Sequence, residues 1–215
     1  MTTLADAARR MNRPDRARGM PRLILMTDTR RLPDPVLVIP CLPAGAAVIL
    51  RHYDDPERAG LALRLARACR EHRIRLLIAG DARLARAVRA DGLHLPEAML
   101  RGGPGTWRLL RRPGWLVTAA AHDEAAVAAA AKAGVSAILL SPVFATASHP
   151  GAPALGPIRF ARLARRSPIP VYALGGIDAA QARRLAASGA AGFAAISGLT
   201  GGMDQAPSAA RSSRS

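Results

Sequence analysis

Eight short apolar runs recur along this chain, and amphipathic stretches rich in Ala, Arg and Leu separate them. Near-continuous apolar runs of this length are typical of parallel strands that are buried on both faces. The alternation predicts a single (β/α)₈ barrel domain over residues 23–199, with an open doubly wound sheet as the alternative. The predicted strands are Leu23–Asp28, Ala47–His52, Arg75–Gly80, Gly92–Leu95, Trp115–Ala121, Ala137–Phe144, Pro170–Gly175 and Gly192–Ser197.

Local signals mark several of the helices between these strands. Apolar residues share one stripe of the Pro56–Arg73 segment. Asp123 is a predicted N-cap for a helix over Glu124–Ala133, and Asp178 with Gln181 resembles a capping box. The proline-rich region after the first strand predicts a short helix there. Little sequence follows the last strand, so we expect the eighth helix to be missing or reduced.

The two ends of the chain differ from the barrel region. Residues 1–22 are locally basic and lack the apolar stretch of a secretory signal, which predicts either a mobile arm or an extra helix. Residues 200–215 consist largely of Gly, Ser and Ala without periodicity. This composition predicts a disordered tail.

The chain is strongly basic, with 31 Lys and Arg against 15 Asp and Glu. The arginines are spread over many segments at helical spacing, and the few aromatic residues offer little for stacking on single-stranded nucleic acid. We therefore interpret the arginines as solvated helix faces and expect no nucleic-acid partner. No apolar run is long enough for a membrane span, so we expect a cytoplasmic protein. The two cysteines have neither disulfide-scaffold nor metal-ligand spacing.

The active site of such a barrel lies at the C-terminal ends of its strands. The seventh strand leads into Gly175 and Gly176, and the eighth leads into Ser197 and Gly198. Glycine lets backbone N–H groups approach an anion closely, and the loops after strands seven and eight are the usual phosphate site of this fold. These four residues are the predicted phosphate site. The alternative is that the glycines only make tight turns.

Two charged or titratable residues end other strands. Arg51 follows five apolar residues, a position suited to a carboxylate or phosphate ligand, or to a salt bridge with a neighbour such as Asp28. His122 ends the fifth strand and is a candidate general acid or base, since imidazole titrates near neutral pH. The alternative for His122 is a helix-start residue without a catalytic role.

Two further positions complete the candidate set. The loop after the sixth strand has the composition of a substrate-binding loop, and Thr146 and His149 are its candidate contacts with an anionic substrate. His94 alternates with leucines inside a strand, so we expect a hydrogen-bonded core residue rather than a ligand.

Several motifs together resemble the thiamine phosphate synthase family, which includes a thiazole tautomerase branch. The resemblance rests on Leu76-Leu77-Ile78, Ala90-Asp91-Gly92-Leu93-His94-Leu95, Ser141-Pro142-Val143-Phe144-Ala145-Thr146, Ala173-Leu174-Gly175-Gly176-Ile177 and the stretch from Ser188 to Ser197. It implies a (β/α)₈ barrel that holds a thiazole phosphate at Gly176, Ser197 and Gly198. It also implies, for the synthases, a reaction that joins a pyrimidine pyrophosphate to the thiazole phosphate with Mg²⁺.

The chain departs from the synthase pattern where pyrophosphate and metal bind. The family's Gln-Leu-Arg-Glu-Lys segment reads Ile49-Leu50-Arg51-His52-Tyr53 here. Further departures are Ala79-Gly80 for Asn-Asp, Met99 for a metal-binding Asp, Ala120 for Ser and His149 for Lys. Mg²⁺ requires hard oxygen ligands, which Gly and Met do not supply.

These departures favour a metal-independent, tautomerase-like enzyme without a cofactor. Its catalytic residues would be His122 and Arg51, and its ligand a small phosphorylated thiazole. One alternative is a synthase with an altered pyrophosphate site, in which Mg²⁺ would be needed and Arg51, His52 and His149 would partly replace the lost groups. In that alternative Asp81, Glu97 and the histidines would bind differently from the family pattern. A second alternative is a non-catalytic barrel that only binds a phosphorylated ligand. The oligomeric state stays open.

Overall fold

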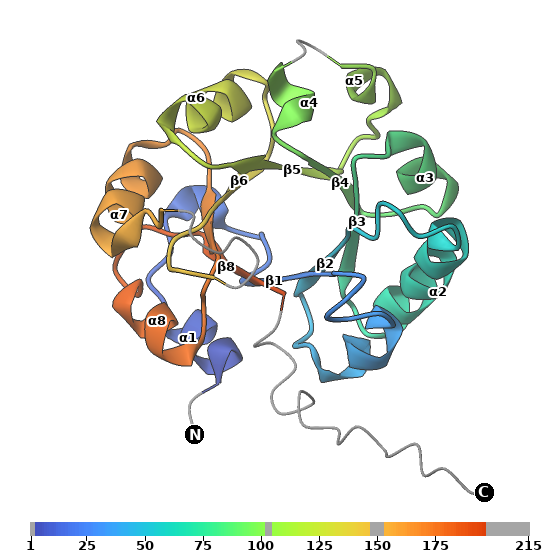
Figure 1. The fold of residues 1–215 in the computed structure, drawn as a ribbon, viewed down its shortest axis with the longest axis horizontal. Coiled ribbons are helices and arrows are strands. Elements are labelled where there is room, and N and C mark those ends of the chain that lie inside the picture. Colours follow the sequence, from blue (N-terminus) through green and yellow to red (C-terminus); the bar gives the residue numbers. More distant parts are fainter. Residues whose placement is uncertain (1–2, 102–104, 147–152, 197–215) are drawn as a thin grey trace, which may run out of the picture.

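The computed structural model describes residues 3–101, 105–146 and 153–196. In this part of the chain eight parallel strands pair in chain order, and the last pairs with the first, so that the sheet closes into a barrel (Figure 1). The (β/α)₈ prediction is confirmed and the open sheet is excluded. The strands are β1 Leu23–Met26, β2 Ala47–Leu50, β3 Arg75–Ala79, β4 Gly92–Leu95, β5 Leu116–Ala121, β6 Ala137–Leu140, β7 Val171–Leu174 and β8 Gly192–Ala195.

Helical segments form a ring around the barrel (Figure 1). Two short helices rather than one separate β4 from β5, and the proline-rich region after β1 forms only a 3₁₀ helix, as expected from its composition. None of the described helices is long and apolar enough to cross a membrane. The helical segments are α1 Leu4–Arg10, η1 Asp15–Ala17, η2 Pro35–Cys41, α2 Arg58–Glu71, α3 Ala82–Ala87, α4 Ala98–Arg101, α5 Trp107–Leu110, α6 Glu124–Lys132, α7 Gly156–Arg166 and α8 Ala179–Arg184.

Several strands end earlier than the apolar runs do. β6 ends at Leu140 rather than Phe144, because Pro142 has no N–H with which to continue the ladder. Beyond it the chain stays near β7, where the Val143 N–H donates to the Leu174 carbonyl at 2.9 Å. The residues that follow these strands are therefore loop residues at the rim of the barrel.

The predicted helix caps are confirmed. The Asp123 carboxylate accepts from the Ala126 N–H, and the Asp178 carboxylate accepts from the Gln181 N–H, each at 2.7 Å. The capping box at Asp178 is incomplete, however, because the Gln181 side chain accepts from Arg184 instead. These caps leave polar residues at the strand-to-helix turns and fix where each helix begins.

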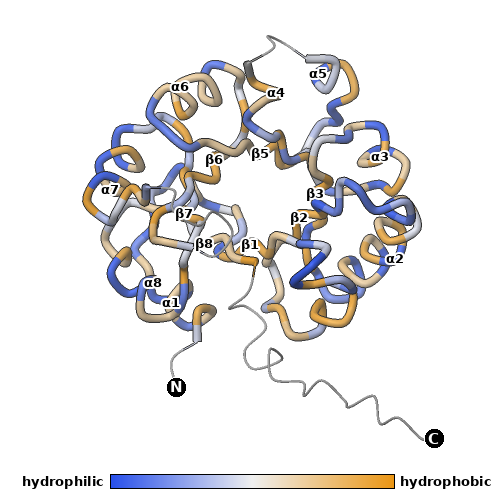
Figure 2. Tube along the Cα trace, viewed as in Figure 1, coloured by the Kyte–Doolittle hydropathy of each residue, from blue (hydrophilic) through white to orange (hydrophobic). Residues whose placement is uncertain are grey.

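Two apolar layers hold the barrel together. Residues such as Ile49 and Leu77 fill its interior, while the alternate residues Val48, Leu50 and Ile78 pack between the sheet and the helices. Figure 2 shows hydrophobic and hydrophilic stretches alternating around the ring of helices. The period-two alternation of each strand thus assigns a residue either to the barrel interior or to the helix-facing layer.

The N-terminal segment forms part of the folded structure. Helix α1 packs against α8, with Leu4 and Ala8 buried (Figure 1). Beyond it, Ala17 joins the interior cluster, and the Tyr172 hydroxyl donates to the Pro21 carbonyl at 2.7 Å. Of the two alternatives for the N-terminal segment, the described residues 3–22 contain the extra helix, and the residues after it lie at the N-terminal end of the barrel.

Candidate active site

The candidate site residues divide into two groups by what the structure describes. Arg51, His122, Thr146, Gly175 and Gly176 all follow C-terminal strand ends and so belong to one rim of the barrel. The other three candidates, His149, Ser197 and Gly198, lie outside the described residues.

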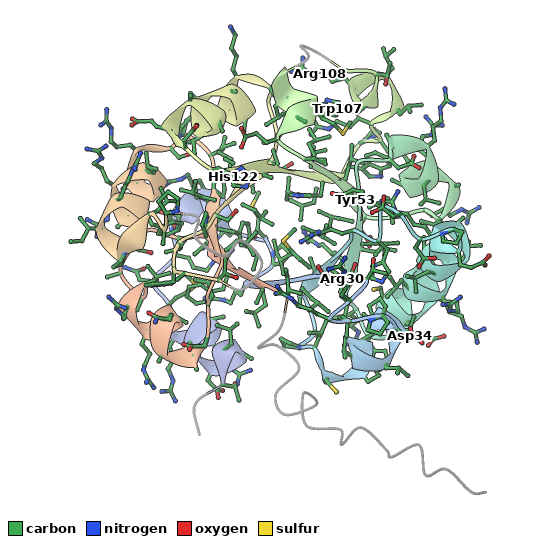
Figure 3. All side chains as sticks on the ribbon, viewed as in Figure 1. Arg30, Asp34, Tyr53, Trp107, Arg108 and His122 are labelled. Carbon is green, nitrogen blue, oxygen red and sulfur yellow. The ribbon has the colours of Figure 1, made fainter. Side chains whose placement is uncertain are left out.

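A carboxylate–imidazole pair is the best-defined feature of this rim. Glu97 follows β4 and His122 follows β5, and because these strands are neighbours their C-terminal ends meet. His122 Nδ1 lies 2.5 Å from Glu97 Oε2. The His122 side chain is half exposed, the Glu97 side chain only 13% exposed, and Figure 3 shows His122 at the inner edge of the helical ring. With Nδ1–H donating to the carboxylate, Nε2 is left as the atom that exchanges a proton with a substrate.

The sequence names Glu97 only in the synthase alternative, as a possible binding residue, and does not predict that it pairs with His122. The family resemblance draws attention to Met99 two positions later, whose side chain instead packs against the hydrophobic core. A usable signal was present, since Glu97 and His122 stand one to two residues beyond two consecutive predicted strands. Parallel neighbours bring such positions together.

Arg51 continues the interior-facing alternation of Ala47 and Ile49 on β2. Its guanidinium lies 3.9 Å from the Asp28 carboxylate, and its side chain is 31% exposed. Burial alone would raise the pKa of Asp28, but backbone N–H donors and the Arg51 and Arg31 charges outweigh it and lower that pKa. The structure therefore contains the predicted salt bridge between Arg51 and Asp28. At 3.9 Å it is too long for a hydrogen bond, so the guanidinium keeps N–H donors for an anion.

His94 is a core residue, as predicted. It is buried inside the barrel, and its Nδ1 lies 2.9 Å from the Thr118 hydroxyl. Burial, reinforced by the positive charge of Arg51, lowers the pKa of His94 to about 3. The imidazole is therefore neutral at physiological pH and cannot add to the positive charge of the rim.

His52 is also buried rather than exposed at the rim. Its Nδ1 lies 2.9 Å from the Thr27 hydroxyl, which also accepts from the Arg51 N–H at 2.9 Å. This contact with Thr27 fixes the turn after β2 and so positions Arg51. We expected His52 to help replace the lost pyrophosphate-binding groups. Its burial against Thr27 does not support that expectation.

Tyr53 and Asp81 occupy the rim after β2 and β3. The Arg58 guanidinium lies 5.5 Å from the centre of the Tyr53 ring, a cation–π distance. The Asp81 carboxylate caps α3 by accepting from the Leu84 N–H at 2.8 Å, and it lies 4.0 Å from Arg58. The Arg58 side chain is thus shared between an aromatic face and a helix cap.

The described carboxylates of this rim do not fit a bound Mg²⁺. Asp28 accepts from two backbone N–H groups and faces Arg51, Asp81 caps a helix, and Glu97 pairs with His122. Within residues 3–101, 105–146 and 153–196, no three His, Cys, Asp or Glu side chains are grouped so as to hold a metal ion. A hard cation needs free oxygen ligands that converge, and these oxygens have other partners.

Gly175 and Gly176 both have positive φ and lie against the loop after β6. A Cβ at Gly176 would stand 2.5 Å from the Ala145 carbonyl oxygen, and one at Gly175 would stand 2.8 Å from Pro142 Cα. The close contact with this loop is enough to require glycine at both positions. The glycines therefore have a structural role, and phosphate binding by them stays a prediction.

Comparison with known proteins places this geometry in context. The family model described as thiamine monophosphate synthase matches residues 25–199. An Aquifex aeolicus protein with the provisional name thiamine-phosphate synthase 2 is 34% identical over 183 residues, which cover 83% of this chain and 97% of that protein. The thiamine-phosphate synthase of Thiobacillus denitrificans is 30% identical over 87% of this chain and 89% of its own length.

A solved structure extends the comparison to the fold. The thiamine phosphate pyrophosphorylase of Pyrococcus furiosus superposes with a TM-score of 0.70 and 24% identity, over 87% of this chain and 91% of that one. The likeness supports the closed eight-stranded barrel.

Proposed function

Because the chain belongs to the thiamine monophosphate synthase family, we propose that it is a transferase that joins a pyrimidine pyrophosphate to a thiazole phosphate. The relatives with synthase names support this alternative better than the tautomerase that the sequence departures favoured. In this proposal the enzyme differs from the family pattern in the residues of its pyrophosphate site.

The single observation that carries the proposal is the position of Arg51. Its guanidinium belongs to the barrel rim, is partly exposed and has only a 3.9 Å contact with Asp28. A planar guanidinium binds two phosphate oxygens at once and is charged at every physiological pH. Arg51 thus supplies positive charge where a pyrophosphate leaving group needs it.

In the proposed reaction the thiazole nitrogen forms a bond to the pyrimidine methylene carbon as the bond to pyrophosphate breaks. Arg51 stabilises the departing pyrophosphate. The loop after β6, with Thr146 and His149, and the strand ends with Gly175, Gly176, Ser197 and Gly198 hold the thiazole phosphate. No step in this scheme depends on a metal ion held by the described carboxylates.

The direct test is to incubate the purified protein with both substrates, with and without Mg²⁺, and to measure thiamine phosphate. We expect product, and we expect Arg51→Gln to reduce its rate of formation by about 100-fold, because an Arg–phosphate contact stabilises the transition state. Arg30→Gln, which removes an exposed charge from the neighbouring β1 loop, is the control and should stay near wild type. Absence of product with and without Mg²⁺ rules the transferase out.

A second function is favoured by the His122–Glu97 pair alone. A carboxylate-oriented imidazole is suited to moving a proton on a bound thiazole phosphate, which is the chemistry of a tautomerase. The assay is proton–deuterium exchange or tautomerisation of the thiazole phosphate, with His122→Ala as the variant. Tautomerisation that is lost in His122→Ala, without any thiamine phosphate formation, selects this second function. Ligand binding without either activity leaves the non-catalytic barrel.

A further inference from the structure

A cavity of about 330 Å³ lies at the opposite end of the barrel from this rim. Helix α1, the segment that leads into β1 and the Pro43–Ala46 turn before β2 form its walls. A Cβ added at Gly45 would meet nothing within 4 Å, so there is open space beside this residue of the turn. The volume lies at the lower end of the range for small-molecule sites.

Three arginines, Arg9, Arg13 and Arg22, are the charged residues that line this cavity, and no acidic residue lines it in the part of the chain that the structure describes. Arg9 already has a carboxylate partner in Asp6. Arg22 donates to the Ala8 carbonyl at 3.0 Å. The positive charge of Arg13 and Arg22 is therefore neutralised by no described carboxylate.

Arg13 is the most constrained of the three. Its terminal nitrogen donates to the Ala17 carbonyl at 2.7 Å and to the Met20 carbonyl at 3.2 Å, while its Nε is buried and has no partner among the described residues. Burial, with the Arg22 charge added, lowers the pKa of Arg13. A buried donor without an acceptor and a charge without a counter-ion both cost folding free energy, and an oxyanion in the cavity would supply the missing counter-ion.

We propose that this cavity binds an oxyanion of the phosphate class, either free phosphate or the phosphate group of a small metabolite. Guanidinium groups recognise phosphate oxygens through paired N–H donors, and Arg13 is already held in place by Ala17 and Met20. The site is separate from the substrate site, because its walls are the N-terminal ends of β1 and β2. It stands whether or not the chain is a transferase.

The experiment is a titration of the ¹⁵N-labelled full chain with inorganic phosphate at constant ionic strength, followed by NMR. The amide signals of Gly45 and Ala8 should shift saturably. Arg13→Gln should weaken this binding by about tenfold or more, since one charge-assisted contact is lost. Arg10→Gln removes an exposed charge from the same helix outside the cavity and should bind phosphate as wild type does.

A second variant tests the site without removing an existing contact. Ala44 is an exposed residue of the cavity wall, and Ala44→Glu places a carboxylate beside the arginines. Phosphate should then no longer shift Gly45. Arg51→Gln at the far rim should leave the Gly45 response unchanged. The site is disproved if Gly45 does not respond saturably in wild type, or if Ala44→Glu responds with wild-type affinity.

Discussion

His122 Nδ1 and Glu97 Oε2 are 2.5 Å apart, although the two residues are 25 positions apart in the chain. The pairing of β4 with β5 brings them together, because each residue stands just beyond its strand. The carboxylate holds one imidazole nitrogen and so orients the other. Glu97 is thus a positioning residue for whatever His122 does.

Glu97→Gln keeps a hydrogen-bond acceptor at this position and removes the charge. We expect kcat to fall by about 10- to 100-fold with KM changed by less than about threefold, since an oriented imidazole acts on the transition state rather than on binding. Steady-state kinetics give kcat and KM separately for whichever activity, transferase or tautomerase, the protein shows. Glu124→Gln, an equal charge change at an exposed carboxylate of α6, should leave both constants unchanged. A rise in KM alone would assign Glu97 to substrate binding instead.

Gly176→Ala tests the close approach between the loops after β6 and β7. The added methyl would stand 2.5 Å from the Ala145 carbonyl oxygen, so the loop must shift. Gly134 also has positive φ but has open space around it, and Gly134→Ala isolates the backbone strain. We expect Gly134→Ala to lower the free energy of unfolding by about 1 kcal/mol and Gly176→Ala to lower it by a further ~1–3 kcal/mol. Urea denaturation of both variants gives the comparison, and equal losses would contradict the contact.

His94 should make the fold sensitive to mild acid. The unfolded imidazole takes up a proton near its ordinary pKa of 6.5, whereas burial lowers the folded pKa to about 3. The stability from neutral His94 is therefore complete above pH 6.5 and falls as the pH drops toward 3, by about 1.4 kcal/mol per pH unit at most. Urea midpoints between about pH 6 and 5 should decline in wild type and in His72→Gln, an exposed control, but much less in His94→Gln. A flat wild-type profile would show that the pKa of His94 is not lowered in the folded protein.

The two cysteines should differ in reactivity. Cys41 is exposed, whereas Cys69 is buried in α2 and burial raises its pKa to about 12. Since the thiolate is the reactive form, a thiol reagent should titrate one group per folded chain and two after unfolding. Cys41→Ser should abolish the reaction of the folded protein. Rapid labelling of Cys69 under native conditions would mean that α2 opens readily.

The sequence predicted the barrel well because each strand carries its own local signal. The apolar runs, the caps at Asp123 and Asp178 and the buried character of His94 were all readable from neighbouring residues. The pairing of Glu97 with His122 was not, since it depends on a contact between residues that follow two neighbouring strands. His52 was misjudged for a related reason. Its position after β2 suggested the rim, but the side chain is buried and contacts Thr27, which directly follows β1.

The contact of α1 with α8 joins the beginning of the described chain to the last helix before β8. The Asn12 N–H donates to the Ala186 carbonyl at 3.2 Å, and the pairing of β1 with β8 lies beside it. Such contacts span almost the whole sequence, so they form late and slow the folding rate. During synthesis α1 leaves the ribosome long before α8 does. Until α8 is available, the apolar face of α1 has no partner against which to pack. Synthesis from the N-terminus therefore cannot complete this fold stepwise, because α8 must leave the ribosome before α1 can pack against it.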